Sequence, residues 1–228
     1  MNKDEVSRII KKYPLEKVIE PDSDPWMSQY DEISALINYA FVRNFKPSKV
    51  LEFGARGGRC TRDILRALLD NKKKFVFKSY ELDNDLRKKA QENLNNEFGD
   101  KAISLGGDVL KAVDIPSGID YLFVDNSHDG TTTEWVFKYL LPKKCKPGAL
   151  VHFHDIQVVG DNVFNIGESN DWSEMKVMSD LDKKKKLPLE KVFFSWEHPA
   201  LWYSREQDGK LFKELRGSSS WWIYKKLT

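Results

Sequence analysis

The sequence predicts an α/β protein built on a parallel sheet, and two features of its pattern lead to that fold class. Short apolar runs that suit buried strands alternate with longer segments whose apolar residues recur at helical spacing. Strands that alternate with helices pair in parallel and are joined by right-handed crossovers. A length of 228 residues suits one domain with a substantial core.

The residues before the first strand are expected to be mainly helical. A short helix is predicted over residues 4–12, followed by an irregular stretch that reaches Trp26. A second helix is predicted from about Gln29 to Asn44, because its apolar residues recur at helical spacing. Pro47 then ends it.

The predicted sheet follows directly. Its first five strands are expected at 49–53, 75–80, 102–105, 119–124 and 149–153. Helices are expected through 64–69, over 84–98 and near 133–141, and a turn at 146–148. Later strands are predicted at 191–195 and 221–224, with a loop over 156–175, a hairpin near 201–203 and a solvated lysine run at 183–186.

Composition excludes several classes of protein. Thirty-seven basic residues nearly balance 35 acidic ones, so the formal charge of +2 predicts neither a nucleic-acid partner nor an anionic membrane. Cys60 and Cys145 lack metal-type spacing and predict no disulfide framework. The chain shows no signal peptide and no run of about 20 apolar residues. We therefore expect a cytoplasmic protein without a membrane span.

The turn after the first predicted strand is rich in glycine. It has the sequence Glu52-Phe53-Gly54-Ala55-Arg56-Gly57-Gly58, and glycine allows a sharp bend and close approach of a ligand. A following helix offers free N–H groups to an anionic group. The dinucleotide fingerprint G-x-G-x-x-G fails, because Arg56 and Arg59 occupy its second and third glycine positions. A phosphate-binding P-loop fails as well, because no G-K-[ST] follows.

Acidic residues stand at or just beyond four successive strand ends. They are Glu52, Glu81, Asp108 and Asp125. The carboxyl ends of parallel strands meet at one edge of a sheet, where such proteins bind their ligands. The spacing Glu52-x-Gly54-x-x-x-Gly58, with these acids, fits a methyltransferase better than a purely structural turn.

Residues of about 48–156 resemble class I S-adenosylmethionine-dependent methyltransferases. The resemblance implies a Rossmann-like three-layer sandwich with a mostly parallel seven-stranded sheet whose last strand is antiparallel. It also implies that S-adenosylmethionine binds along the carboxyl edge, with Glu81 on the ribose hydroxyls and Asp108 near the adenine amino group. The implied cofactor-binding residues are Glu52, Gly54, Ala55, Arg56, Gly58, Glu81, Leu82, Asp108, Val109 and Asp125. Arg56 departs from the family, because many relatives carry a small residue there.

A narrower resemblance concerns the segments Ile119–His128 and Lys146–Ile156, which are similar to macrocin-type sugar O-methyltransferases and cephalosporin-hydroxylase-type relatives. It implies Mg²⁺ or another divalent cation held by Asp125, His154 and Asp155, and His128 as the base that deprotonates the acceptor, with Asp125 also in a catalytic role. An alternative is that the His154-Asp155 pair only hydrogen-bonds the rim of the sheet. For His128, the alternative is an ordinary surface histidine.

The resemblance as a whole predicts methyl transfer to a hydroxyl of a small molecule or sugar. We expect a helical extension or lid over residues 1–46, a methyltransferase domain over 47–228 and, by analogy, a homo-oligomer. Aromatic residues of the last quarter suit either an acceptor pocket or the core. Three alternatives remain: a methyltransferase for nucleic acid or protein, a non-catalytic binding module, and an iron-dependent hydroxylase, which would need a facial triad.

Overall fold

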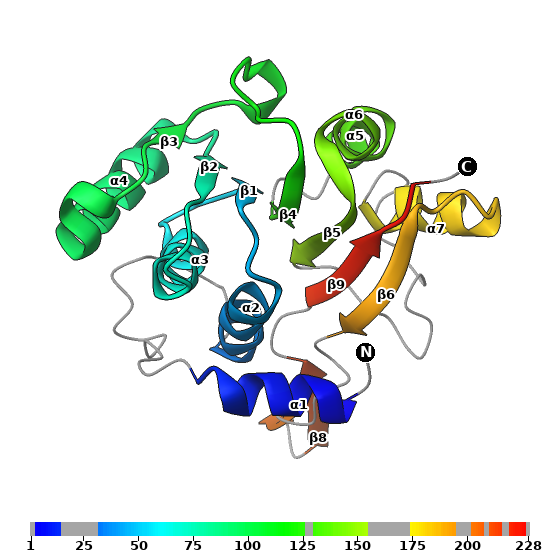
Figure 1. Cartoon of the computed structure of the whole chain (residues 1–228). Helices are drawn as coiled ribbons and strands as arrows, with labels where there is room; N and C mark the ends of the chain where they lie inside the picture. Colours follow the sequence, from blue (N-terminus) through cyan, green and yellow to red (C-terminus); the bar gives the residue numbers. More distant parts are fainter. Residues whose placement is uncertain are drawn as a thin grey trace.

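A seven-stranded sheet forms the centre of the protein (Figure 1). The computed structural model describes residues 3–14, 32–125, 130–154, 174–194, 202–207, 210–215 and 219–226. The strands of the sheet are β1 (Lys49–Phe53), β2 (Val76–Tyr80), β3 (Leu105–Gly106), β4 (Ile119–Val124), β5 (Cys145–His154), β6 (Leu189–Phe194) and β9 (Ser219–Tyr224). Strands β7 (Trp202–Gln207) and β8 (Lys210–Leu215) pair as a separate antiparallel hairpin.

The order of strands across the sheet is β3-β2-β1-β4-β5-β9-β6. Strands β1 to β5 pair in parallel with their neighbours, whereas β9 is antiparallel to both β5 and β6. This arrangement confirms the predicted Rossmann-like fold, including its antiparallel last strand. The strand order reverses between β1 and β4, and open parallel sheets bind their ligands at the carboxyl ends of the strands on either side of such a reversal.

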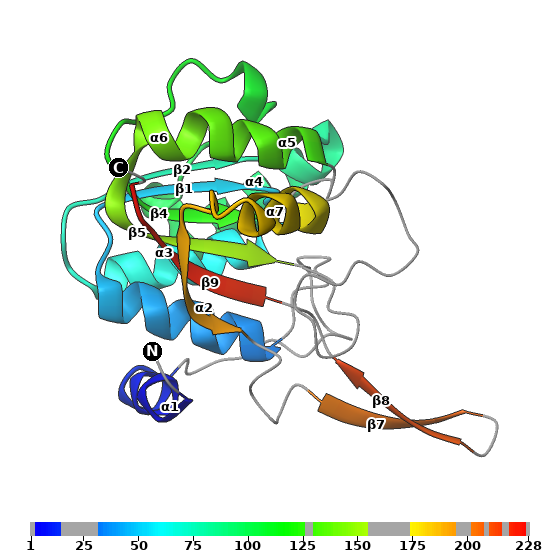
Figure 2. The same ribbon diagram turned by 90° about the vertical axis from the view of Figure 1, so that its right-hand side faces the viewer.

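Helices cover both faces of the sheet. They are α1 (Lys3–Lys12), α2 (Glu32–Phe45), α3 (Arg59–Asp70), α4 (Asn84–Phe98), α5 (Gly130–Trp135), α6 (Leu141–Lys144) and α7 (Glu174–Lys183). A π-helical segment, η4 (Val136–Leu140), joins α5 to α6, and short 3₁₀ turns lie at η2 (Gly99–Lys101) and η3 (Val109–Lys111). Helices α2 and α3 lie on one face, and α5 to α7 lie on the other (Figures 1 and 2).

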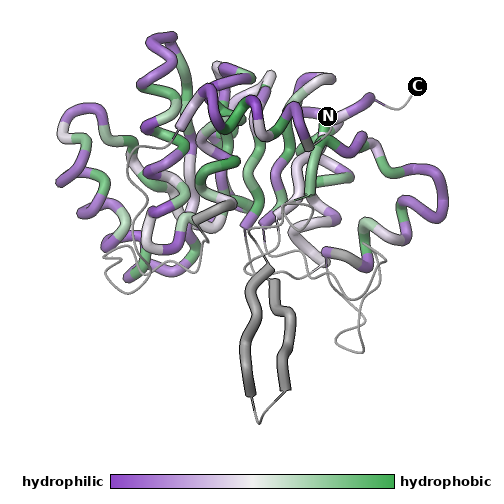
Figure 3. Tube along the Cα trace, turned by 90° about the horizontal axis from the view of Figure 1, so that it is seen from below, coloured by the Kyte–Doolittle hydropathy of each residue, from purple (hydrophilic) through white to green (hydrophobic). Residues whose placement is uncertain are grey.

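Alternation along the strands separates the core into two layers. On β1, Val50 packs toward α2 and α3, whereas Leu51 and Phe53 pack toward α5 and α6. Side chains that alternate in this way bury both faces of a parallel sheet. Figure 3 shows the result, with hydrophobic segments in the strands and hydrophilic ones in the outer turns.

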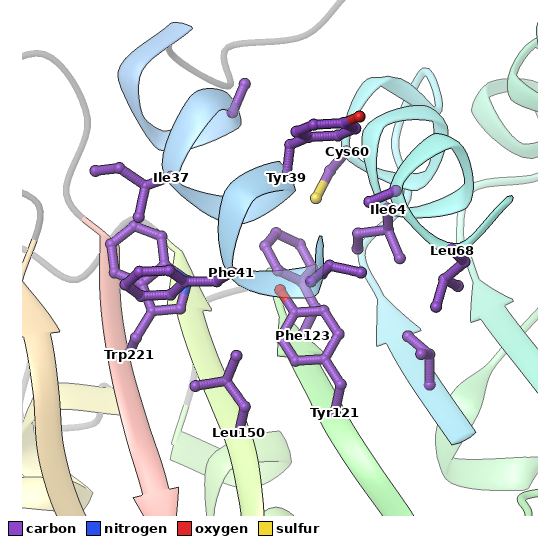
Figure 4. Packing of buried hydrophobic residues seen from close by; sticks show 14 of the residues in the cluster. Ile37, Tyr39, Phe41, Cys60, Ile64, Leu68, Tyr121, Phe123, Leu150 and Trp221 are labelled. Atoms are coloured by element: carbon purple, nitrogen blue, oxygen red, sulfur yellow. The ribbon is translucent and has the colours of Figure 1, made fainter. Parts of the chain in front are cut away.

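Trp221 on β9 lies at the centre of the α2 layer (Figure 4). Its indole is fully buried, meets the Phe41 ring edge-on at 5.4 Å and stacks on the His152 imidazole at 4.3 Å. His152 Nδ1 lies 3.3 Å from the Tyr121 hydroxyl, which also hydrogen-bonds Asn38 of α2. Burial lowers the pKa of His152 well below its usual value, so the ring packs as a neutral group.

Three elements differ from those predicted. The third strand begins at Leu105 rather than Ala102, because the Gln91 side chain of α4 binds Ile103 O and Leu105 N in place of a neighbouring strand. The turn predicted at 146–148 lies inside β5 as an irregularity of the pairing, with Gly148 at φ 87°. Helix α7 begins at Glu174, within the stretch predicted as loop.

Both cysteines, Cys60 and Cys145, are buried free thiols, as the absence of a disulfide framework predicted. No helix of the described residues has the length and apolar character that a membrane span requires. The division into an extension over 1–46 and a domain over 47–228 stays a prediction, although Val6 of α1 and Phe41 of α2 share the core with the sheet.

Candidate functional site at the carboxyl edge of the sheet

The glycine-rich turn connects β1 to α3 through backbone conformations that favour glycine. Gly54 and Gly58 have φ values of 89° and 91°, and Arg56 has φ 47°. The N–H groups of Gly54 and Ala55 both donate to Tyr80 O, at 2.9 and 3.2 Å. The turn is therefore tied to the end of β2, and the α3 N-terminus that follows has no side-chain cap. A helix N-terminus placed beside such a turn can bind an anionic group of a ligand.

Glu81, directly after β2, binds the same turn. Its Oε2 accepts a hydrogen bond from Arg56 N at 2.5 Å, and its Oε1 accepts one from Asp83 N at 2.9 Å. Arg87 donates to the Glu81 carbonyl at 2.9 Å. Only 8% of the Glu81 surface is exposed, and these hydrogen bonds hold its carboxylate in a fixed position beside the turn. A carboxylate placed in this way can accept both hydroxyls of a ribose.

Three more predicted cofactor-binding residues are Leu82, next to Glu81, and Asp108 and Val109, just beyond β3. Leu82 is 73% exposed, which leaves an apolar surface open to a ring. The Asp108 carboxylate accepts from Leu110 N at 3.0 Å and lies 3.1 Å from the Lys111 ammonium, and Val109 is buried behind it. Gly106 makes this corner possible, because a Cβ there would lie 2.4 Å from the Tyr80 ring.

Glu52 is buried beneath the turn rather than exposed in it. Its Oε2 accepts hydrogen bonds from the hydroxyls of Thr61, at 2.6 Å, and Ser79, at 2.5 Å. Burial raises its pKa to about 7, although both hydrogen bonds lower it. These contacts show Glu52 joining β1, β2 and α3 under the turn. Sequence reasoning missed Thr61 and Ser79, because a single hydroxyl carries no spacing signal.

The raised pKa of Glu52 makes its effect on stability depend on pH. The folded protein holds the proton more tightly than the unfolded chain, whose carboxyl titrates near 4.5. The stabilising contribution of that proton is therefore complete below pH 4.5 and is lost as the pH rises toward 7. We expect Glu52→Gln to stabilise the protein by about 2 kcal/mol at pH 8 and by much less at pH 5. Urea denaturation at the two pH values measures this. Equal effects at both pH values, or the same gain for the exposed Glu92→Gln, would contradict it.

Two of the three predicted metal ligands lie together at the ends of β4 and β5. His154 Nδ1 is 3.4 Å from Asp125 Oδ2, with 2% of the His154 side chain and 23% of the Asp125 side chain exposed. The Asp125 N–H donates to Phe53 O at 2.9 Å, which places this pair next to the glycine-rich turn. Asp155 and the predicted base His128 lie outside the described residues.

The donor set fits a divalent cation in part. One carboxylate and one imidazole converge, and both are suitable ligands. Within the residues that the structure describes, no group of three or more His, Cys, Asp or Glu side chains is placed to hold a metal ion. The alternative in which the His154-Asp155 pair hydrogen-bonds the rim of the sheet stays a prediction, because Asp155 lies outside the described residues.

Comparisons with known proteins agree with this geometry. The sequence model of a family described as a methyltransferase domain matches residues 51–156, which include the end of β1, the turn and β2 to β5. No curated protein sequence matches the chain at a significant level. The fold resembles those of solved methyltransferase structures, of which three illustrate the range of identity.

One is an O-methyltransferase from Bacillus cereus in complex with S-adenosylhomocysteine, at 12% identity and a TM-score of 0.57, covering 96% of this chain and 89% of that one. Another is the O-methyltransferase TomG from Streptomyces achromogenes, involved in tomaymycin synthesis and solved with S-adenosylmethionine, at 13% identity and a TM-score of 0.58, covering 98% and 91%. The third is the Podospora anserina methyltransferase PaMTH1 with S-adenosylhomocysteine bound, at 17% identity and a TM-score of 0.58, covering 99% and 97%. Likeness at these identities concerns the fold.

Proposed function

We propose that this chain, whose residues 51–156 match a methyltransferase domain, is a class I methyltransferase that binds S-adenosylmethionine and transfers its methyl group to a hydroxyl of a small molecule or sugar. The observation that carries the cofactor assignment is the Glu81 carboxylate fixed against the glycine-rich turn by Arg56 N. The fold neighbours that hold S-adenosylmethionine or S-adenosylhomocysteine support it.

We assign different residues of the carboxyl edge to different parts of the cofactor. Glu81 accepts the ribose hydroxyls, Leu82 covers the adenine, and Asp108 with Val109 closes the adenine side. The uncapped start of α3 and the turn Gly54–Gly58 face the methionine end, and Glu52 supports the turn from below. Glycine at 54 and 58 keeps side chains away from this path.

Asp125 and His154 lie where an acceptor hydroxyl would meet the methyl group, beside the end of β1. The donor sulfonium already activates the methyl group, so the protein mainly aligns the two reactants and removes a proton from the hydroxyl. We assign the proton removal to His128, with Asp125 orienting the acceptor. A divalent cation held by Asp125, His154 and Asp155 would lower the pKa of the hydroxyl. We also propose that the chain forms a homo-oligomer.

Metal dependence of methyl transfer tests the finer part of the proposal. Purified protein, S-adenosylmethionine labelled in the methyl group, and a panel of catechols, simple glycosides and nucleotide sugars are assayed with Mg²⁺ and with EDTA. We expect EDTA to abolish transfer, added Mg²⁺ to restore it, and Asp125→Asn to lower the rate by about 100-fold. The matched variant Asp85→Asn, whose side chain is 95% exposed, should keep the rate.

The outcomes separate the parts of the proposal. Full activity in EDTA would contradict the proposed role of a metal but not the proposed methyl transfer. Transfer to RNA or protein, with none to the hydroxyl panel, would replace the acceptor class by the nucleic-acid or protein alternative. Cofactor binding without transfer to any acceptor would favour a non-catalytic binding module.

A further inference from the structure

The amino edge of the sheet, opposite the candidate site, gathers exposed lysines. Helices α2, α3, α6 and α7 run back from the carboxyl edge, so the turns that lead into β1, β2, β5 and β6 meet at this edge. Strand β9 is antiparallel and ends there too. The exposed lysines of these turns are Lys46, Lys72–Lys74, Lys143, Lys146, Lys183–Lys186 and Lys225–Lys226. We call this set the basic edge.

The acids of the same turns are largely engaged within the protein. Asp70 accepts from the Tyr39 hydroxyl at 2.5 Å and pairs with Arg43 at 3.3 Å. Asp120 accepts from the N–H groups of Ser48 and Lys49, at 2.9 and 2.7 Å. Asp120 also lies 3.6 Å from the Lys146 ammonium, and Glu190 lies 2.7 Å from that of Lys225, so these acids partly neutralise two lysines of the basic edge.

Two lysine runs dominate the basic edge. Lys72–Lys74 precede β2, and Lys184–Lys186 precede β6. All six side chains are exposed, and none forms an ion pair within the part of the chain that the structure describes. Strands β2 and β6 are five positions apart in the sheet, so the runs lie about 24 Å from each other. The positive charge is therefore spread along the amino edge of the sheet and is not concentrated at one position.

We propose that the basic edge rests on the anionic headgroups of a phospholipid membrane. Turns at a sheet edge make a broad surface; Figure 3 shows hydrophilic turns on this side, and Figure 2 shows that β9 ends there. Lysines near such a surface are attracted by its negative headgroups. Phe45, 37% exposed beside Lys46, adds an apolar side chain of the kind found at membrane interfaces.

A nucleic acid fits these observations less well. Proteins that read bases use arginines in a groove or aromatic rings that stack on bases. Near the basic edge, Arg43 in the last turn of α2 already pairs with Asp70 and lies over the Tyr39 ring. The described part of the basic edge carries lysine charges but has no helix or strand placed to enter a groove of a nucleic acid.

The formal charge of +2 predicts no membrane partner, because a sum over the whole chain combines two edges of the sheet that differ in charge. Acids such as Glu81, Asp83 and Asp108 lie at the carboxyl edge, and lysines collect at the amino edge. Strands of five to six residues separate the two edges by about 18 Å. On a membrane, the candidate site would face away from the surface at that height.

Vesicle sedimentation tests the proposal with the full chain. Binding is measured to vesicles of phosphatidylcholine alone and with 30% phosphatidylserine, at 50 and 500 mM NaCl. We expect binding only to the anionic vesicles at low salt, because salt screens surface charges. The double variants Lys73→Glu/Lys74→Glu and Lys184→Glu/Lys186→Glu should each weaken binding at least tenfold. The matched control Lys88→Glu/Lys89→Glu, on exposed positions of α4, should leave it unchanged.

Three results would overturn the proposal. They are absence of binding to the anionic vesicles at 50 mM NaCl, an equal loss in the α4 control, and displacement of the protein from vesicles by duplex RNA that binds more tightly. Circular dichroism of each variant shows whether a loss of binding follows from unfolding. The proposal concerns the edge opposite the cofactor residues, so its failure leaves the proposed methyl transfer untouched.

Discussion

Glu81→Gln is expected to weaken binding of S-adenosylmethionine and S-adenosylhomocysteine by about 100-fold. The substitution removes the charge from the two hydrogen bonds to the ribose that we propose, and charge-assisted hydrogen bonds contribute about 1.5–3 kcal/mol each. It also replaces one acceptor with an amide NH₂ that cannot accept from Arg56 N or Asp83 N, which loosens the glycine-rich turn. Isothermal titration calorimetry of the variant and the wild type measures the loss.

The control for Glu81 is Glu92→Gln on α4, an exposed carboxylate away from the turn. It should bind both ligands as the wild type does. Unchanged affinity in Glu81→Gln, with a native circular dichroism spectrum, would mean that this carboxylate does not hold the ribose. The cofactor would then need another position along the edge.

Trp221→Ala is expected to destabilise the protein by about 3–5 kcal/mol. The indole is fully buried between α2 and the sheet, and its removal leaves a cavity beside Phe41, His152 and Phe193. The surrounding backbone belongs to β5, β6, β9 and α2, so it collapses into the cavity only in part. Urea denaturation followed by circular dichroism gives the change in the free energy of unfolding.

Val113→Ala provides the control for this loss, because its side chain is 98% exposed. We expect a change within about 0.5 kcal/mol there. A loss below 1 kcal/mol for Trp221→Ala would show that β9 does not anchor the α2 layer. The aromatic residues of the last quarter would then be free to serve a pocket, the alternative that the sequence left open.

Much of the fold was predictable, because buried parallel strands leave a strong local pattern. The bounds of β1, β4 and α4 agree with those predicted from apolar runs and helical spacing. The third strand was placed too early, because its pairing depends on Gln91 from another element. Local patterns do not record a side chain that replaces a neighbouring strand.

The candidate site was predictable to the extent that its residues stand at strand ends. Glu81 and Asp125 lie where the predicted ends place them, because parallel strands bring their carboxyl ends to one edge. The role of Glu52 beneath the turn was not predictable, since it depends on hydroxyls from α3 and β2. The basic edge was not predictable either, because lysine runs far apart in the sequence reach the same edge of the sheet only once the helices are folded back.

The central claim is that the carboxyl edge of this sheet binds S-adenosylmethionine. Isothermal titration of the wild-type protein with S-adenosylhomocysteine and with S-adenosylmethionine tests it most directly. We expect one binding site per chain for each ligand, in competition with one another. A folded protein that binds neither ligand would contradict the claim, whatever the acceptor or the metal.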